Sequence, residues 1–225
     1  MAHSIILLPL IGFLISCSLS FFKSNKFIDR AAEIITSLFI TITAIFSFYI
    51  FIDNIGDPSI VSIKLFNWIS SGSFNADWSI YLDTATRVML VVITSVSALV
   101  HIYSIGYMSH DDSKPRFMGY LSLFTFAMLM LVTADNFLQL FFGWEGVGLA
   151  SYLLIGFWYK KPTANAAAIK AFIVNRIGDF GLALGIFTIF IVFGSIEYQT
   201  VFGNVSSFKN VNFSFLGVEL HALTL

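Results

Sequence analysis

The chain has 225 residues, of which 57% are hydrophobic and only 11% carry a charge. A water-soluble domain usually carries about 25% charged residues, so this composition excludes an ordinary soluble protein and indicates an integral membrane protein. The single cysteine, Cys17, excludes an internal disulfide, a cysteine-ligated iron–sulfur cluster and a zinc cluster in this sequence. The net charge of -1 provides no overall basic field for nucleic acid.

Long apolar runs, rather than amphipathic periodicity, define the expected elements. A helix rises about 1.5 Å per residue, so about 20 apolar residues are needed to cross a hydrocarbon core of about 30 Å. The runs that meet this requirement are residues 4–22, 31–52, 84–106, 117–134, 137–159 and 164–193. The run 216–225 is expected to start a seventh helix, too short to span by itself. The sequence therefore predicts an all-α polytopic transmembrane helix bundle, a single membrane domain over residues 1–225.

The charges in the connections predict the orientation of the bundle. Basic residues follow the first, third and fifth spans, namely Lys23, Lys26, Arg30, Lys114, Arg116, Lys160 and Lys161. The alternate connections hold only Lys64 and Lys209 as basic residues. By the positive-inside rule the three basic connections face the cytoplasm or the matrix, and the N-terminus lies on the outer side. A cleaved signal peptide is the alternative for residues 4–22, but basic residues would then precede the apolar run.

The longest connection, residues 53–83, is expected to fold on the outer surface. Residues 60–68 and 78–82 have the composition of β-strands, and a segment rich in serine and glycine separates them. We therefore expect a small β-hairpin here. Its Trp68, Trp78 and Tyr81 would suit the lipid headgroup zone.

Glu145, in the middle of the fifth span, is the first functional candidate. An ionisable group at the centre of a membrane helix costs about 2.5 to 3.5 kcal/mol, so a span that keeps one needs a reason. The carboxylate is either paired with a cation from another helix or protonated, and a proton relay alternates between these two states. A static interhelical salt bridge is the alternative. Gly146 and Ala150 favour close helix packing around it, and Trp144 is interpreted as a packing residue.

Arg176 and Asp179, in the sixth span, form a second pair of candidates. Their spacing of three places them on one helix face, where the two charges can neutralise each other. Two interpretations stay open: a self-satisfied pair that anchors this helix, or a switchable ion pair that changes the pKa of a neighbouring carboxylate. Gly178, Gly181 and Gly185 predict a small-residue face for helix packing.

Other ionisable residues are secondary candidates. Lys170 lies near the basic end of its span and is interpreted first as an interface anchor. His101 could handle protons, although a lone histidine is more often only hydrogen-bonded. Asp83 and Arg87 are four residues apart and predict a surface ion pair. The sequence offers no metal-ligand spacing and no legible catalytic triad, so it does not support a self-contained enzyme.

Four motifs carry a family resemblance: HIYSIGYM at residues 101–108, RFMGYLSLFTF at 116–126, DNFLQLFFGWEGVGLASYLLIGFWY at 135–159 and NRIGDFG at 175–181. Together they closely resemble subunit L, also called chain 5, of the proton-pumping NADH-quinone oxidoreductase, respiratory complex I, within the antiporter-like family. The resemblance extends over essentially the whole chain.

The resemblance implies roles for three residues. Glu145 matches the intramembrane glutamate of the family's first half-channel, and Arg176 and Asp179 match the paired charges on the following helix. Members of the family have a dozen or more spans, and a lysine on the next helix partners the glutamate. The chain therefore resembles an N-terminal part that ends before this lysine. We expect its Glu145 to lack a cation and to stay protonated, and we expect that the chain alone does not pump protons.

The resemblance also implies the biochemical setting. The expected function is that of a membrane-arm subunit that contributes to proton translocation coupled to electron transfer. NADH, flavin, iron–sulfur clusters and quinone would belong to other subunits, with no cofactor or metal in this chain. The expected partners are other membrane subunits, including a neighbouring antiporter-like subunit, and the lipid of a bacterial or mitochondrial inner membrane. The alternatives are a subunit of a multi-subunit sodium/proton antiporter and a non-transporting scaffold or degenerate remnant.

Overall fold

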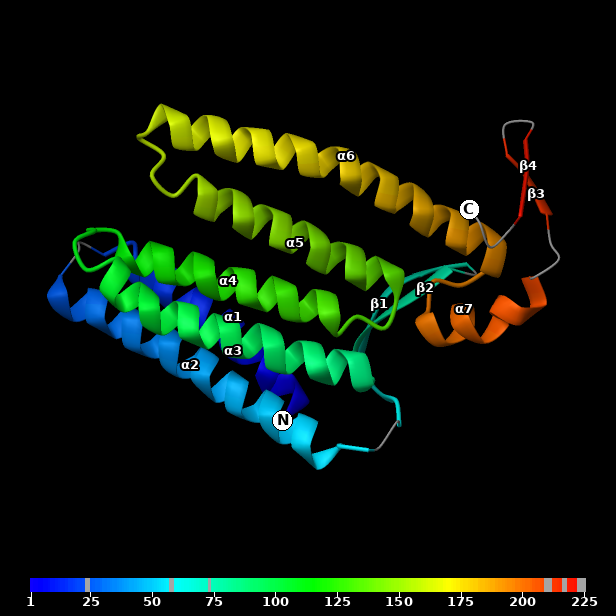
Figure 1. Cartoon of the computed structure of the whole chain (residues 1–225), viewed down its shortest axis with the longest axis horizontal. Helices are drawn as coiled ribbons and strands as arrows, with labels where there is room; N and C mark the ends of the chain where they lie inside the picture. The colour runs from blue at the N-terminus through cyan, green and yellow to red at the C-terminus, as the bar shows by residue number, and fades with distance from the viewer. Residues whose placement is uncertain (23–24, 57–58, 73, 209–211, 216–217, 222–225) are drawn as a thin grey trace.

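The computed structural model describes residues 1–22, 25–56, 59–72, 74–208, 212–215 and 218–221, the last two segments by their backbone alone. Six of its helices are long and apolar enough to cross a membrane (Figure 1). They are α1 (Ala2–Leu19), α2 (Lys26–Asp53), α3 (Thr84–Tyr107), α4 (Lys114–Val132), α5 (Phe137–Ile155) and α6 (Pro162–Phe193). The six predicted spans are therefore confirmed, and the chain is an integral multi-pass membrane protein.

Local side chains fix where the helices begin. The side chain of Asn25 accepts a hydrogen bond from the backbone of Phe27 at 3.4 Å, which starts α2 five residues before the predicted span. Asn136 caps α5 in the same manner through the backbone of Gln139, at 2.8 Å. Apolar runs locate the spans but give no information on these capping groups, so the observed helix ends differ from the predicted ones by a few residues.

Two turns shape the last long helices. The chain leaves α5 at Ile155, four residues before the predicted end, and turns until Pro162 starts α6 in a position that favours proline. Gly194 ends α6 with φ of 69°, a left-handed conformation in which a residue with a side chain is strained.

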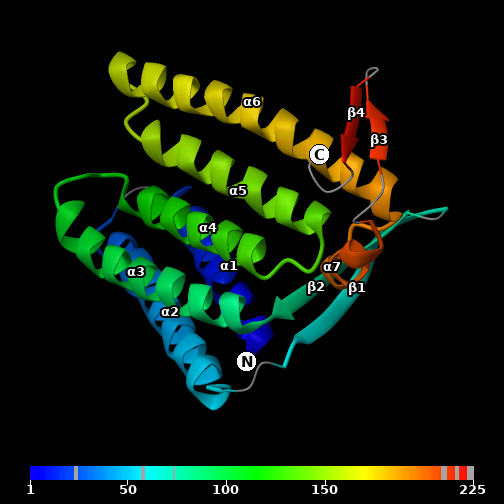
Figure 2. The same ribbon diagram turned by 45° about the vertical axis from the view of Figure 1, so that its right-hand side comes forward.

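The helices form a compact group of four, to which a pair is added. Helix α1 packs against α2 and α4, and α2 also packs against α3. Helix α5 lies on α4, and α6 lies on α5 at the edge of the bundle; Figures 1 and 2 agree on this order. The bundle therefore ends with α6, whose far side has no neighbouring helix in the described part of the chain.

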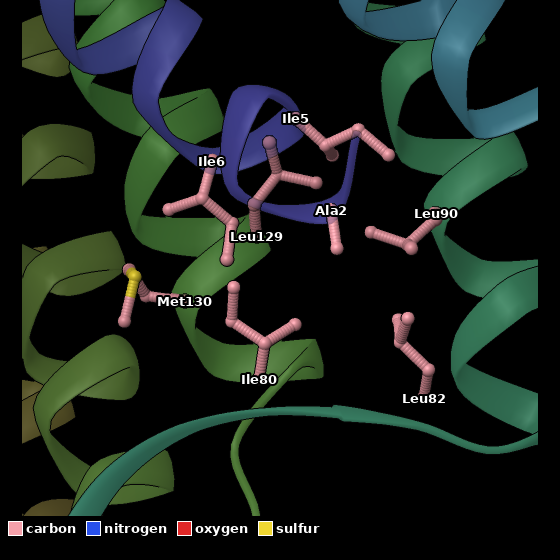
Figure 3. Close-up of a cluster of buried hydrophobic side chains, with 8 residues drawn as sticks. All are labelled: Ala2, Ile5, Ile6, Ile80, Leu82, Leu90, Leu129 and Met130. Carbon is pink, nitrogen blue, oxygen red and sulfur yellow. The ribbon is translucent and has the colours of Figure 1, made fainter. Parts of the chain in front are cut away.

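The predicted β-hairpin is confirmed and is longer than expected. Strand β1 (Val61–Ser71) pairs with antiparallel β2 (Phe74–Leu82). Gln139 of α5 fastens the hairpin to the bundle, because its side chain donates to the carbonyl oxygen of Ser79 at 2.8 Å and accepts from the amide of Ser79 at 3.0 Å. Apolar residues of β2, α1, α3 and α4 meet beneath it in one buried cluster (Figure 3): Ala2, Ile5, Ile6, Ile80, Leu82, Leu90, Leu129 and Met130.

Two expectations need correction. A helix was expected over residues 216–225, but Val218–His221 forms strand β4, which pairs with β3 (Asn212–Phe215); the remaining residues lie outside the described segments. The sequence Val-Glu-Leu-His alternates apolar and polar residues, which is a strand period and not a helical one. Helix α7 (Tyr198–Asn204) and the 3-10 turn η1 (Val205–Phe208) were not predicted.

The pair Asp83 and Arg87 also differs from its prediction. Asp83 caps α3 by accepting from the amide of Thr86 at 2.7 Å. Arg87 is buried and donates to the carbonyl oxygen of Ser59 at 2.8 Å. Within the described segments no ion pair within 4 Å joins the two residues, so the predicted surface ion pair is wrong. The capping geometry directs the carboxylate toward the helix backbone.

Candidate functional site

The site begins with a close contact between α4 and α5. A Cβ atom placed on Gly143 would lie 2.5 Å from the backbone nitrogen of Leu131, a separation that no side chain tolerates. A Cβ on Gly146 would lie 3.0 Å from the Cβ of Ala127. These two glycines therefore let α5 approach α4 closely, as small residues do in membrane helix pairs. The contact fixes the part of α5 that carries Trp144 and Glu145.

Arg176 of α6 joins the two candidate carboxylates. Its Nη1 makes a salt bridge with the Oε2 of Glu145 on α5 and lies 3.4 Å from the Oδ2 of Asp179 on its own helix. Since α5 and α6 run antiparallel, positions 145 and 176 come opposite each other although they are far apart in sequence. All three primary candidates from the sequence thus meet in one cluster.

Besides the two carboxylates, the guanidinium of Arg176 contacts an aromatic ring of its own helix. Its Cζ lies 4.6 Å from the ring centroid of Phe172, in the range of a cation–π interaction. The side chain of Arg176 is nevertheless 46% exposed, against 24% for Glu145 and 9% for Asp179. The cation is therefore the most open member of the cluster, and Asp179 is the most enclosed.

Trp144 completes the cluster and was not predicted as a member of it. Its indole Nε1 donates to the Oδ1 of Asp179 at 2.7 Å. The two oxygens of Asp179 thus face different partners, one the indole and the other the guanidinium of Arg176. An indole N–H only donates, so a tryptophan next to an intramembrane carboxylate is a signal that sequence reading could have used.

The expectation that Glu145 lacks a cation within this chain is wrong. The expectation was based only on the lysine that a later helix supplies in the family. Arg176 was assigned to Asp179 because of their spacing in the sequence. The folded chain brings Arg176 across the interface between α5 and α6, where it reaches both carboxylates. The structure thus replaces a local pair by a group of two carboxylates around one guanidinium.

The secondary candidates lie outside this cluster. His101 is fully buried between α3 and α4, where its Nδ1 contacts the carbonyl oxygen of Ser97 at 2.8 Å and its Nε2 contacts the hydroxyl of Ser122 at 3.2 Å. Lys170 is exposed on α6, nearer than Arg176 to the basic end. Neither residue is brought into contact with Glu145 in the described part of the structure.

The small-residue face predicted on α6 finds no packing partner. Within the described residues, no atom lies within 4 Å of a Cβ placed on Gly178, Gly181 or Gly185. Large apolar side chains of the same helix, such as Ile177 and Phe187, are also exposed. The cluster of charges is therefore covered by α5 on one side and open on the other.

Two family models match the chain. The model described as "NADH-Ubiquinone oxidoreductase (complex I), chain 5 N-terminus" matches residues 68–118, and the model described as "NADH:quinone oxidoreductase/Mrp antiporter, TM" matches residues 134–224. The second match contains all four members of the charge cluster. Together the two matches cover β2, α3, α5 and α6, the end of β1 and the start of α4.

Curated relatives are similar over nearly the whole chain. NADH-ubiquinone oxidoreductase chain 5 of Chondrus crispus is 52% identical over 98% of this chain and 33% of its own length. NADH-quinone oxidoreductase subunit L of Rickettsia felis is 54% identical over 86% of this chain, and that of Rhodobacter capsulatus is 47% identical over 100% of it. These matches cover 31% and 32% of the two proteins, so the chain spans about a third of the length of its relatives.

Two solved structures share the fold at low sequence identity. The Mrp complex from Dietzia sp. aligns with a TM-score of 0.69 at 22% identity, over 88% of this chain and 20% of that one. The membrane-bound sulfane sulfur reductase, described as an archaeal respiratory membrane complex, aligns with a TM-score of 0.76 at 16% identity, over 92% of this chain and 40% of that one. At these identities the likeness concerns the fold alone.

Proposed function

The chain belongs to the family of complex I chain 5, or subunit L, and from this premise we propose that it contributes to proton translocation in the membrane arm of an NADH-quinone oxidoreductase. Relatives at about 50% identity are subunits of that enzyme, which supports this setting over that of a sodium/proton antiporter. The proposal concerns a segment that spans about a third of those relatives.

The observation that supports the proposal is the position of Arg176 between two carboxylates. In the structure the guanidinium is paired with Glu145, and a neighbouring cation in general favours the ionised form of a carboxylate. Arg176 Nη1 lies 3.4 Å from the Oδ2 of Asp179. A shift of Arg176 toward Asp179 would leave Glu145 without its cation and favour proton uptake. Return of the guanidinium would favour release. One side chain would thus alternate the protonation of Glu145.

Electron transfer would take place elsewhere in the complex. We assign NADH, flavin, iron–sulfur clusters and quinone to other subunits, and to this chain only the movement of protons. The other membrane subunits, including a neighbouring antiporter-like one, would be its partners, and the open side of α6 would suit further helices. The basic end of the bundle would face the cytoplasm or matrix, and the N-terminus would then lie on the outer side of a bacterial or mitochondrial inner membrane.

The test is proton transport by the assembled complex in membrane vesicles with a pH-sensitive dye. With Glu145→Gln we expect NADH-driven acidification to fall while the complex still assembles, because glutamine keeps the shape and loses the titratable group. Glu197→Gln is the matched control. Glu197 is a carboxylate beyond the end of α6, so this variant should transport protons normally. Undiminished transport by Glu145→Gln would overturn the proposal, and transport driven by a sodium gradient would indicate the antiporter instead.

A further inference from the structure

A hollow lies at the basic end of the bundle, outside the charge cluster. It has a volume of about 310 Å³ and is formed by the α3–α4 connection, the first turn of α4 and the α5–α6 connection. Its basic lining residues are His110, Arg116, Lys160 and Lys161. This volume is about ten times the ~30 Å³ that one water molecule occupies in the liquid, so the hollow has room for a polar group of several atoms.

Aromatic rings hold the cations of this hollow. The guanidinium carbon of Arg116 lies 4.6 Å from the ring centroid of Phe157 and 5.1 Å from that of Tyr159, and Lys161 Nζ lies 4.9 Å from the ring centroid of Trp158. Arg116 also donates to the carbonyl oxygen of Phe157 at 3.2 Å, while its buried Nε has no hydrogen-bond partner among the described residues. A guanidinium suits a phosphate because its donors lie in one plane and carry a fixed positive charge.

Two acidic residues, Asp111 and Asp112, also line the hollow, against three permanent cations, so one net positive charge remains. One oxygen of Asp111 accepts from the backbone of Ser113 at 2.8 Å and the other from Trp158 Nε1 at 3.0 Å. Among the described residues, no carboxylate lies within 4 Å of the Nζ of Lys160 or Lys161. The two lysines, both exposed, therefore remain available for an anion together with Arg116.

An apolar groove lies next to the hollow, toward the middle of the membrane. Its volume is about 420 Å³, and it lies over α4 between α3 and α5, lined by residues such as Val96, Val100, Leu121, Phe124, Met128 and Leu154. Leu154 of the groove lies in the last turn of α5, and Trp158 of the hollow follows four residues later in the α5–α6 connection. Phe117, one turn from Leu121, packs its ring against Phe157 of the hollow at 5.1 Å. The groove thus leads toward the cationic hollow.

We propose that this surface is a binding site for one anionic phospholipid, with its phosphate in the hollow and an acyl chain in the groove. Three cations facing one hollow complement a phosphate, and basic pockets between membrane helices bind anionic headgroups. Tryptophan and tyrosine side chains around the hollow match the interface at which a headgroup lies. The apolar groove explains why the ligand is a lipid and not a free phosphate. The site does not depend on proton transfer at Glu145.

The experiment measures the thermal unfolding of the purified full chain in neutral detergent during titration with lipid. We expect phosphatidylglycerol to raise the unfolding temperature at much lower concentration than phosphatidylcholine with the same acyl chains. The double variant Lys160→Gln/Lys161→Gln should bind phosphatidylglycerol more than tenfold more weakly, because each charge lost near the surface weakens binding by about fivefold. The single variant Arg116→Gln should weaken binding too, and the lysine variant keeps the test valid if Arg116→Gln fails to fold.

Two controls separate this site from general attraction. Lys26→Gln/Arg30→Gln removes two charges at the same end of the bundle but on α2, away from the hollow, and should leave the phosphatidylglycerol effect unchanged. Met128→Trp fills the groove and should weaken lipid binding, whereas Leu99→Trp, at an exposed position of α3 that does not line the groove, should not. Equal effects of the Lys160→Gln/Lys161→Gln and Lys26→Gln/Arg30→Gln variants would overturn the proposal, as would stabilisation by inorganic phosphate equal to that by phosphatidylglycerol.

Discussion

Two polar centres within the membrane spans contrast in their surroundings. His101 lies inside the group of four helices and contacts neutral groups of Ser97 and Ser122. The guanidinium of Arg176 lies between α5 and α6, at the open edge of the bundle, and contacts two carboxylates. Both centres hold an ionisable side chain within a membrane span, but only the second offers its cation two alternative anions.

The contrast indicates what distinguishes a fixed polar contact from a switch. A histidine surrounded by neutral hydroxyl and carbonyl groups has its hydrogen bonds satisfied in one arrangement, and these groups do not stabilise a second one. A guanidinium shared by two carboxylates has two arrangements of similar chemistry, and a third partner can bias them. Substitutions at the two centres should therefore have different consequences.

Removal of the shared cation should have the largest effect. With Arg176→Gln, the two carboxylates lose their common partner, and we expect proton transport by the assembled complex to fall by about 10²-fold, as when a positioned proton-transfer group is lost. Arg176→Lys keeps the charge and should retain part of the activity, since lysine cannot form the same planar contacts. Dye-monitored acidification in vesicles measures both. Equal activity of the glutamine and lysine variants would indicate that the charge is not what matters.

The close packing of α5, which carries Trp144 and Glu145, against α4 depends on Gly143. Gly143→Ala would place a methyl group 2.5 Å from the backbone of Leu131, so α4 and α5 must separate. We expect the free energy of unfolding to fall by about 3 kcal/mol, the upper end of the usual cost of overpacking, because the contact is with backbone. Gly148→Ala on the same helix is the control, since no described atom lies within 4 Å of its added Cβ. Denaturant titration in detergent compares the two, and equal losses would contradict the close contact.

His101 should matter for stability and not for transport. With His101→Leu the hydroxyl of Ser122 loses a buried partner, and we expect a loss of about 2 kcal/mol in the free energy of unfolding. His101→Gln can keep a hydrogen bond and should lose less. If His101 only packs and hydrogen-bonds, the glutamine variant transports protons at the normal rate. A transport defect with unchanged stability would instead make His101 part of a proton path.

The sequence was sufficient for the bundle because the signal that defines a membrane span is local. The hydrophobicity of residues 84–106, for example, located α3 to within one residue of its observed end. The hairpin was also predictable, because its two strand-like segments are adjacent in the chain. In contrast, α7 and the strand pair near residue 218 have weak local signals.

The charged members of the site were predicted, but their contacts were not. Glu145, Arg176 and Asp179 were selected because charges within apolar spans are costly. Which charges meet depends on how α5 and α6 are rotated against each other, and spacing within one helix cannot report that rotation. The sequence spacing therefore favoured a pair of Arg176 and Asp179, and the packing of the two helices added Glu145 and Trp144.

The smallest effect is expected from Trp144, the residue that sequence reading assigned to packing alone. In Trp144→Phe the ring is largely kept and the Nε1 donor to Asp179 is lost. Asp179 would then compete better for Arg176, so the guanidinium should leave Glu145 more often, and we expect proton transport to change by about fivefold, the equivalent of one hydrogen bond. The control Trp158→Phe removes an indole donor at the basic end instead.

The pH dependence of transport separates a switch from a structural contact. If the indole biases the position of Arg176, its loss should displace the pH profile of transport by Trp144→Phe. A purely structural role of Trp144 would lower the rate equally at every pH. The shift, and not the loss of rate, is therefore the measurement that tells whether the indole biases the position of Arg176.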